Sequence, residues 1–343
     1  MGLKGEQRKQ LAAIRKLIKS KEWADVKQGL ALLESVKDED IWALFAAGIR
    51  LSSDGALMDS SVELRKRMTH AFRINATLSA ARHAGLLDSL THLDLRPPWG
   101  GGREHGALRD ISPLSGLTAL TDLNLHSEWN VSDFAPLATL KNLTHLNISS
   151  CSQVADLRPL AALTNLTHLN IRACSQVADL RPLAALTNLV QLDLSCTDVH
   201  DLRPLQGMTQ LTRLSLEGCT AVVDLHPLKT LTTLTWLHLG GDQNQAHSAL
   251  TDLSALSGLT GLQRLSLSDC TGLRDIRPLQ ELTALTYLSL SIHHRYGVTT
   301  LDDLRPLHAL KSLTHLDLRW RGLSRDESAA LQEALPHCQG LHD

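Results

Sequence analysis

The chain has 343 residues, of which 43% are hydrophobic and 3% aromatic, and its formal net charge at pH 7 is -2. The length and hydrophobic content allow a substantial buried core, while the small net charge excludes a global attraction to nucleic acid or to an anionic membrane. No run of eighteen apolar residues occurs, so we expect no membrane span. The first ten residues lack the apolar region of a secretory signal, and we expect six free cysteines in a cytoplasmic protein.

Residues 1–86 contain no repeat and have the pattern of helices. We expect four helices, over residues 3–20, 23–36, 38–51 and about 60–83. The first of them is strongly basic, which leaves two interpretations open. It is either a helix that binds an acidic surface or nucleic acid, or a soluble helix whose apolar stripe packs on the next helix.

A repeat begins at residue 87. Residues 143–166 return as residues 166–189 with only two differences, which indicates a recent tandem duplication, and a related pattern recurs along most of the chain. Ten units, with starts 22 to 30 residues apart, begin at Leu87, Leu117, Leu140, Leu163, Leu186, Met208, Leu231, Leu259, Leu282 and Leu310.

Each unit combines a strand with a helical turn. Alternating apolar residues such as Leu146 and Ile148 predict a short strand with alternate side chains buried. The following Asp-Leu-Arg-Pro-Leu cannot lie inside a strand, because Pro lacks the N–H that a sheet requires. We expect Asp156 to cap a helical turn and Pro159 to lie in its first turn. One unit cannot bury its leucines alone, so the units must stack.

The unit L-x-x-L-T-x-L-x-L/I-x-x-C, followed by D-L-R-P-L, resembles leucine-rich repeat proteins, and most closely the SDS22-like and internalin-like subclass. The resemblance covers residues 87–323. It implies an α/β fold: a right-handed solenoid, or horseshoe, with a parallel sheet on the concave side and short helical turns on the convex side. It also implies a binding scaffold without catalytic chemistry.

The two ends of the array need covers for their exposed leucine layers. We assign residues 1–86 as a helical N-terminal cap and residues 324–343 as a C-terminal capping helix and tail. The second assignment rests on Ser324 and Glu327, which match a capping box, and on Pro336, which ends the helix after Leu335.

Four cysteines, Cys151, Cys174, Cys219 and Cys270, share the twelfth position of the unit. A metal or redox ladder is one interpretation, but a parallel ladder spaces its side chains evenly and cannot gather four of them around one tetrahedral ion. The other interpretation is favoured: each Cys fills the turn after the strand as a small buried side chain. We therefore expect no metal and no cofactor.

Side chains at the sixth, eighth and tenth positions of each unit should project from the concave sheet. Most are small and polar, but Trp236, Arg264 and Tyr287 occupy the sixth position in consecutive units, with a guanidinium between two aromatic rings. Such a patch is typical of protein interfaces; alternatively, it is packed under a nearby loop. The predicted partner-binding residues are Arg213, Trp236, His238, Arg264, Tyr287 and His315.

Three units carry insertions rich in Gly, His and polar residues, at residues 96–107, 240–249 and 291–300. We expect exposed loops that leave one edge of the sheet and help to line the binding side. The glycines at 100–102 predict a flexible loop, since no G-K-[ST] follows them. His145 and His168 occupy equivalent positions in neighbouring units and could offer two imidazoles to a metal ion. The tandem duplication explains why the two histidines recur, so a metal site is not favoured.

Arginines of the D-L-R-P motif form a second row, on the convex side. Each has an Asp two residues earlier, so we expect a solvated ridge of paired charges in preference to a basic ridge that attracts an acidic partner. The members are Arg158, Arg181, Arg203, Arg277 and Arg305.

These features favour a noncatalytic scaffold that binds a protein or peptide on the concave sheet and edge loops. No Ser-His-Asp, Cys-His, phosphate-loop or metal motif is recognisable. The alternative is a bacterial effector or an enzyme-associated regulator. Some proteins with arrays that resemble this one are associated with ubiquitin ligases or with phosphatases. We expect a bacterial cytoplasmic protein, or an effector exported without a cleavable signal. A monomer is favoured, although the sequence does not determine the oligomeric state.

Overall fold

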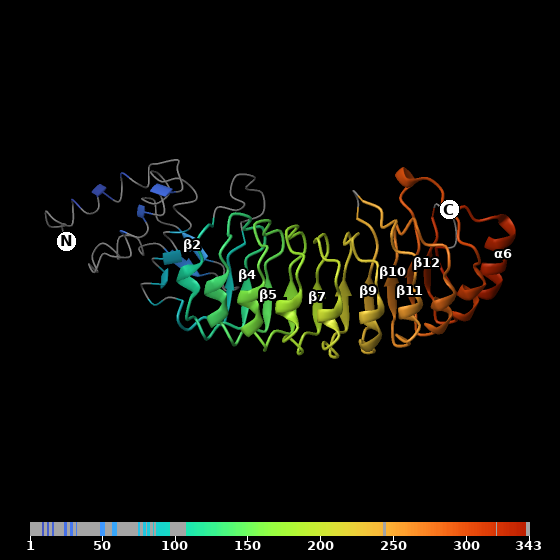
Figure 1. Ribbon diagram of the computed structural model, residues 1–343, viewed down its shortest axis with the longest axis horizontal. Coiled ribbons are helices and arrows are strands. Elements are labelled where there is room, and N and C mark those ends of the chain that lie inside the picture. The colour runs from blue at the N-terminus through green and yellow to red at the C-terminus, as the bar shows by residue number, and fades with distance from the viewer. Residues whose placement is uncertain are drawn as a thin grey trace. The chain divides into compact units, whose positions relative to one another are not determined.

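The structure, a computed structural model, describes residues 87–96, 108–242, 245–319 and 321–340, together with scattered positions before residue 87 (Figure 1). The chain divides into two compact units, Met1–Val154 and Ala155–Asp343. Ten described strands, β3 to β12, belong to parallel sheet, and their order in the sheet follows their order in the chain. We describe the two units in turn.

In the first unit, a short antiparallel pair precedes the repeats. Strand β1 (Ile49–Leu51) pairs with β2 (Leu57–Asp59), and Arg50 lies opposite Met58. The helix predicted over residues 38–51 is therefore wrong at its C-terminal end. The sequence between the two strands contains Asp54-Gly55, a dipeptide that favours a tight reversal between strands.

The repeats of the first unit alternate short strands with 3-10 helices. The elements are β3 (His92–Asp94), η1 (Ser112–Leu114), β4 (Asp122–Asn124), η2 (Ala135–Thr139) and β5 (His145–Asn147). Strand β4 pairs in parallel with both β3 and β5, and the register places Leu123 beside Leu93 and Leu146.

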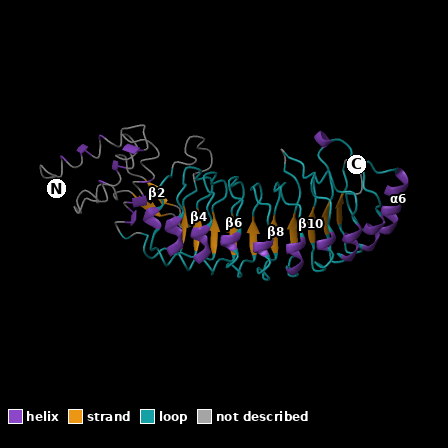
Figure 2. Cartoon of the chain, viewed as in Figure 1, coloured by secondary structure: helices purple, strands orange, loops and turns teal. Residues whose placement is uncertain are grey.

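The second unit continues the same alternation through seven strands (Figure 2). Its strands are β6 (His168–Asn170), β7 (Gln191–Asp193), β8 (Arg213–Ser215), β9 (Trp236–His238), β10 (Arg264–Ser266), β11 (Tyr287–Ser289) and β12 (His315–Asp317). Its helices are η3 (Arg158–Ala162), η4 (Arg181–Leu183), η5 (Arg203–Leu205), η6 (His226–Thr230), η7 (Ser254–Leu256), η8 (Arg277–Glu281), η9 (His294–Tyr296), η10 (Arg305–Ala309) and α6 (Arg325–Ala334).

The core of the second unit is a set of aligned leucine columns. Each strand pairs with the next in parallel, and the central leucines face one another in register, as Leu192 does with Leu169 and Leu214. These leucines and the apolar residues at the ninth position are almost completely buried. Because a strand exposes alternate side chains on opposite faces, one face of each three-residue strand enters the core and the other stays open. The predicted stacking is confirmed.

The helical turns form as the D-L-R-P-L motif predicts, but as 3-10 helices of three to five residues. Asp156 accepts a hydrogen bond at 2.9 Å from the N–H of Arg158, the first residue of η3, and Pro159 lies in the first turn. The last residue of the motif, Leu160, is the third residue of η3 and is buried. Side-chain capping and a fixed proline angle therefore compensate for the short length of these helices.

The C-terminal helix α6 begins where the capping box predicts it. Ser324 accepts a hydrogen bond from the N–H of Glu327, and the Glu327 side chain accepts one from the N–H of Ser324. After the helix, Gln339 pairs with the open edge of β12: its N–H donates to Thr314 and its carbonyl accepts from Leu316. This pairing occupies an edge that would otherwise present free backbone groups.

The start of the array is covered in part by described residues of the first unit. Leu78 and Ala81 are fully buried, and the Asn75 side chain accepts hydrogen bonds from the N–H groups of Arg109 and Asp110, at 3.1 and 2.9 Å. The wider helical cap over residues 1–86 stays a prediction, as does the role of its basic first helix, most of which lies outside the described residues. In the described parts of the chain, no helix has the length and apolarity needed to cross a membrane.

Candidate functional site

Five of the six predicted partner-binding residues form one continuous row across five strands. The first residue of each strand from β8 to β12 lies directly beside the first residue of the next, because the parallel register pairs them. The row reads Arg213, Trp236, Arg264, Tyr287, His315. The structure therefore brings together residues that are up to 102 positions apart in the sequence, and cationic or imidazole groups alternate with aromatic rings. We call these five residues the sheet-face row.

Contacts along the row are between side chains. The guanidinium carbon of Arg264 lies over the Tyr287 ring, 5.7 Å from its centroid, within the range of a cation–π interaction. The Tyr287 and His315 rings lie 6.4 Å apart at an interplanar angle of 34°. His238, the sixth predicted residue, lies two positions beyond Trp236, and their rings meet edge to face at 6.0 Å. All six residues are thus part of one surface.

The row is accessible along its whole length. Arg213, Arg264 and His315 are exposed, while Trp236, His238 and Tyr287 are half-buried. The alternative that a loop covers the patch completely does not agree with this exposure.

The charge of this face is set by its arginines. At the sixth, eighth and tenth positions of β8 to β12 there are two carboxylates, Asp317 and Glu217. Asp317 pairs with Arg319 at 2.7 Å, and Glu217 pairs with Arg172 at 2.5 Å. No described carboxylate lies within 4.0 Å of the guanidinium group of Arg213 or Arg264. Two cationic groups on this face therefore lack a neutralising partner.

The Arg172–Glu217 pair was not identified as a site feature from the sequence. Both residues occupy the tenth position, two units apart, and Ser195 in the unit between them is too short to separate them. A scan for opposite charges at the same position of alternate units would have found the pair. Near it, burial lowers the pKa of His238; the charge of Glu217 opposes this shift and that of Arg172 adds to it. His238 is therefore an uncharged imidazole at neutral pH, and Arg213 and Arg264 supply the positive charge.

The insertion at residues 240–249 is more buried than predicted. His247 is 1% exposed, and its ring nitrogens lie 2.9 Å from the carbonyl oxygen of Leu239 and 2.7 Å from that of Val222. A Cβ atom on Gly241 would lie 2.3 Å from the Gln245 carbonyl oxygen, so the chain returns closely on itself there. The composition of this insertion had predicted an exposed loop. No sequence pattern marks a histidine that is buried with backbone carbonyls as its partners.

The insertion at residues 291–300 has a packed base and an exposed tip. Ile292 is buried, whereas Arg295 and Val298 are exposed, and Val298 is the more notable because 60% of its surface is open. The His293 and His294 rings stack with centroids 4.1 Å apart. This loop follows β11, the strand that carries Tyr287, which agrees with the predicted position of a binding-side loop. The third insertion, at residues 97–107, lies outside the described residues.

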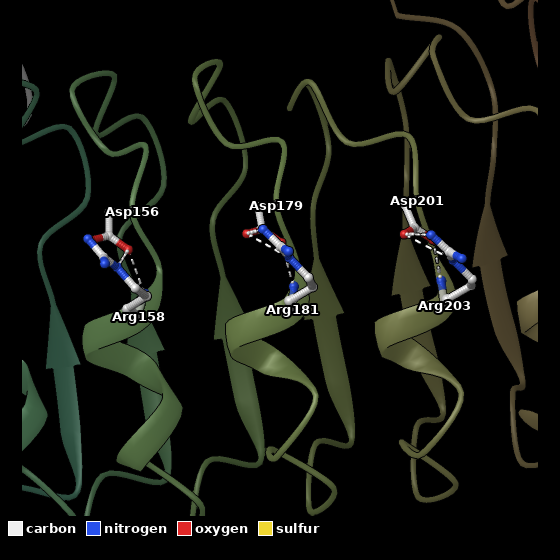
Figure 3. A network of polar contacts seen from close by, with 6 residues as sticks. All are labelled: Asp156, Arg158, Asp179, Arg181, Asp201 and Arg203. Carbon is white, nitrogen blue, oxygen red and sulfur yellow. Dashed lines mark hydrogen bonds and ion pairs between the residues drawn. The ribbon is translucent and has the colours of Figure 1, made fainter.

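On the other side of each unit, the predicted ridge of paired charges is confirmed (Figure 3). Arg203 donates from Nε and Nη2 to the two carboxylate oxygens of Asp201, which also accepts the Arg203 backbone N–H. These hydrogen bonds lower the pKa of Asp201 to about 2. The same geometry recurs at Asp156–Arg158, Asp179–Arg181, Asp275–Arg277 and Asp303–Arg305. We call these five pairs the helical-turn row.

Comparison with known proteins agrees with this geometry. Residues 141–185 match the family described as leucine-rich repeats (2 copies). The fold is similar to that of an internalin (inlF) from Listeria monocytogenes, with 25% sequence identity and a TM-score of 0.56 over 77% of this chain and 85% of the internalin chain. The chain is a leucine-rich repeat protein. It is also similar to internalin C2 (inlC2) of the same organism, with 27% identity and a TM-score of 0.47 over 60% of this chain and 83% of the other. No curated protein matches the chain.

The cysteines of this leucine-rich repeat protein have the structural role that was favoured. Cys151, Cys174, Cys219 and Cys270 are fully buried and all six cysteines are free. The Cys219 thiol donates at 3.1 Å to the carbonyl of Leu194, the ninth residue of the preceding unit, and Cys151 does the same to Leu125 at 3.2 Å. The described residues contain no group of three or more His, Cys, Asp or Glu that could hold a metal ion.

An arginine replaces cysteine at the same position of the last unit of this leucine-rich repeat protein. Arg321 is 2% exposed, and its Nε donates at 2.6 Å to the carbonyl of Leu290, again the ninth residue of the preceding unit. Its other nitrogens donate to the carbonyl of Cys270 at 3.1 Å and to the Thr299 hydroxyl at 2.9 Å. Burial lowers the pKa of Arg321 to about 10, so it remains charged at neutral pH. Counting positions from Leu310 would have found this anchor.

Proposed function

We propose that this chain is a noncatalytic interaction scaffold that binds a protein or peptide through the sheet-face row and the adjoining loops at residues 240–249 and 291–300. The observation that carries the proposal is the alternation of accessible aromatic rings with two uncompensated arginines across five adjacent strands. Tyr, Trp and Arg dominate the binding energy of protein interfaces, because they combine a large apolar area with directional polar groups.

The properties of the cysteines support a scaffold in preference to a thiol enzyme. Burial raises the pKa of Cys196 to about 11 and that of Cys270 to about 12. Because the thiolate is the nucleophile, groups with such high pKa values are almost fully protonated and inert at neutral pH. The side chains at the twelfth position are also committed to backbone carbonyls inside the core.

The cellular setting is part of the same proposal. Free cysteines that pack as small apolar groups fit a reducing compartment, and we propose a cytoplasmic, monomeric protein of bacterial origin. The fold similarity to Listeria internalins supports the bacterial origin. Export as an effector without a cleavable signal is the alternative setting, and it leaves the binding face unchanged.

Binding measurements on matched variants test the proposal. Partners would be captured from lysate on the intact chain, identified, purified and titrated against three proteins: the unmodified chain, a Trp236→Ala/Tyr287→Ala variant, and an Arg203→Ala/Arg277→Ala control on the helical-turn row. We expect the aromatic variant to weaken binding at least about tenfold, since two interface aromatic residues are lost, and the control to bind normally.

Thermal unfolding of the same three proteins distinguishes lost contacts from lost folding. Equal dissociation constants for the intact chain and the aromatic variant would remove the sheet-face row from the interface. Ubiquitin transfer or modulation of a phosphatase by the intact chain would instead favour the enzyme-associated regulator.

A further inference from the structure

The sheet-face row has a regular spacing that restricts what it can bind. Neighbouring strands in a sheet lie about 4.8 Å apart, so residues at the same position on alternate strands are separated by about 9.6 Å. Arg213 and Arg264 flank Trp236 in this arrangement, and Trp236 and Tyr287 flank Arg264. The surface therefore offers a cation and an aromatic ring in turn, each with a repeat of about 9.6 Å.

The chemistry of this repeat calls for an acidic partner. Arg213 and Arg264 are exposed, and the two carboxylates at the sixth, eighth and tenth positions of β8 to β12 are already held by Arg319 and Arg172. A guanidinium group binds a carboxylate through parallel N–H donors, and no described residue of this chain supplies one to either arginine. His315, the last residue of the row, continues the alternation with an imidazole beside Tyr287.

Only some backbone conformations place carboxylates on one side at this separation. A polyproline II helix rises about 3.1 Å per residue with three residues per turn, so every third side chain projects from the same edge at intervals of about 9.3 Å. A β-strand repeats on one face at about 6.6 Å and about 13 Å, neither of which fits. An α-helix offers about 6 Å at four residues and about 10.5 Å at seven. Polyproline II is the nearest match.

The rings between the arginines fit the same ligand. Trp236 and Tyr287 are half-buried with one part of each ring open, and proline-rich segments dock on aromatic side chains in other recognition surfaces. A polyproline II segment is also already extended before it binds, so it loses little conformational entropy on binding. Prolines between the acidic residues would lie over the rings while the carboxylates reach the arginines.

We infer that the sheet-face row recognises a proline-rich acidic segment in the polyproline II conformation, which runs across the strands with an acidic residue at every third position. This inference rests on the proposed function and adds the chemistry and the spacing of the partner. The segment would place one carboxylate on Arg213 and the next on Arg264, with the intervening residues over Trp236.

Two synthetic peptides of identical composition test the spacing. The first is (Glu-Pro-Pro)4, and the second is (Glu-Pro-Glu-Pro-Pro-Pro)2, in which the same four acidic residues are two and four positions apart. Both are labelled and titrated with the full chain by fluorescence anisotropy at low salt. We expect the first to bind at least about fivefold more tightly, because only its carboxylates share one edge of the helix at the arginine spacing.

Two further arms test the charge and the site. (Lys-Pro-Pro)4 should not bind, and an Arg213→Gln/Arg264→Gln variant should weaken binding of (Glu-Pro-Pro)4 about tenfold, since two charge-assisted contacts are lost. The matched control is Arg203→Gln/Arg277→Gln, which removes two arginines from the helical-turn row and should bind normally. Both variants change exposed side chains, and their thermal unfolding should match that of the intact chain.

Three results would overturn the inference. These are equal affinity for the two Glu-Pro peptides, no detectable binding of either, and tighter binding of a helical Ala-rich peptide with Glu at every seventh position. The inference can fail without the proposed function: a captured partner that depends on Trp236 and Tyr287 but has no acidic proline-rich segment would leave the scaffold standing. A captured partner that neither depends on Trp236 and Tyr287 nor contains an acidic proline-rich segment would contradict both the proposed function and this inference.

Discussion

The two rows of arginines in this leucine-rich repeat protein differ in what surrounds the same side chain. In the helical-turn row, each arginine is held by an aspartate two residues earlier, as Arg203 is by Asp201. In the sheet-face row, Arg213 and Arg264 have a tryptophan between them and no described carboxylate within 4.0 Å. The first row presents neutral pairs to solvent, and the second presents positive charge on an aromatic surface.

The difference shows that exposure alone does not identify a binding residue. Arginines of the helical-turn row have 75 to 84% of the side chain accessible, and they recur more regularly than those of the sheet-face row. Their carboxylate partners are nevertheless built into the same motif, so each guanidinium group already faces a neutralising charge. The proposed binding surface is therefore the sheet-face row, where no aspartate stands two residues before Arg213 or Arg264.

The largest effect is expected where an arginine is neither exposed nor paired with a carboxylate. Replacing Arg321 by Met would leave the carbonyls of Leu290 and Cys270 and the Thr299 hydroxyl without their buried donor. We expect a loss of about 3 kcal/mol in the free energy of unfolding, because charge-assisted bonds inside a core are strong and orphaned carbonyls are costly. Urea unfolding followed by circular dichroism measures the change.

The matched control for Arg321 is Arg305→Met in the helical-turn row, where 84% of the side chain is accessible. We expect no measurable change in its unfolding midpoint, since a solvated pair contributes little. If both variants were destabilised equally, burial would not explain a difference between Arg321 and Arg305 in their contribution to stability.

The next effect concerns a buried carboxylate, the opposite of the exposed aspartates in the helical-turn row. Glu128 is 1% exposed and accepts the N–H of Leu108 at 3.0 Å, and burial raises its pKa to about 8. The unfolded chain ionises near pH 4.5, below the folded chain, so the contribution of Glu128 to stability is fully present below pH 4.5 and is lost as the pH rises through about 8. We expect Glu128→Gln to stabilise the protein by on the order of 2 kcal/mol at pH 9.

The Glu128→Gln measurement is a pair of urea unfolding curves at pH 5 and pH 9. Gln keeps an oxygen for the Leu108 N–H and cannot ionise, so the gain should be small at pH 5 and appear only at the higher pH. A gain of the same size at both pH values would mean that the charge of Glu128 is not its cause.

A smaller effect on stability, but a clear effect on binding, is expected in the sheet-face row. The Arg213→Gln/Arg264→Gln variant should leave the unfolding temperature within about 2 °C of the intact chain, because both side chains are exposed and neither forms an ion pair with a described carboxylate. The same variant should lose about tenfold in affinity for the acidic peptide. Destabilisation without loss of affinity would reverse the assignment of the row from binding to folding.

The smallest effect is expected for Asp201→Asn in the helical-turn row. Asn keeps the oxygen that accepts the Arg203 backbone N–H at 3.0 Å and loses only the charge. Hydrogen bonds from the Arg203 side chain and backbone lower the pKa of Asp201 to about 2, so the contribution of this carboxylate is present above pH 3.8 and is lost as the pH falls through about 2. At pH 7 we expect a shift in unfolding temperature of less than about 1 °C. A large shift would show that the pairs stabilise the helical turns beyond capping them.

The regular parts of the fold could be predicted from the sequence because each depends on a local pattern. Leu-x-Leu alternation sets the strands, Asp and Pro set the start of each 3-10 helix, and Ser324 with Glu327 sets the C-terminal helix. The helix expected over residues 38–51 was wrong at its C-terminal end, where β1 pairs with β2. The interior position of His247 was also missed, because its acceptors are backbone carbonyls, which every residue carries.

The sequence by itself determined the repeat, the buried faces and the pairing of the helical-turn row, since all of these follow from residues within one unit. Only the tertiary structure decided which residues of different units meet. The parallel register aligns Arg213, Trp236 and Arg264, and it places Arg172 against Glu217. Stacking also buries Arg321 among the carbonyls of earlier units. A contact between units depends on how many residues each loop inserts and on the register of the strands, which no single unit encodes.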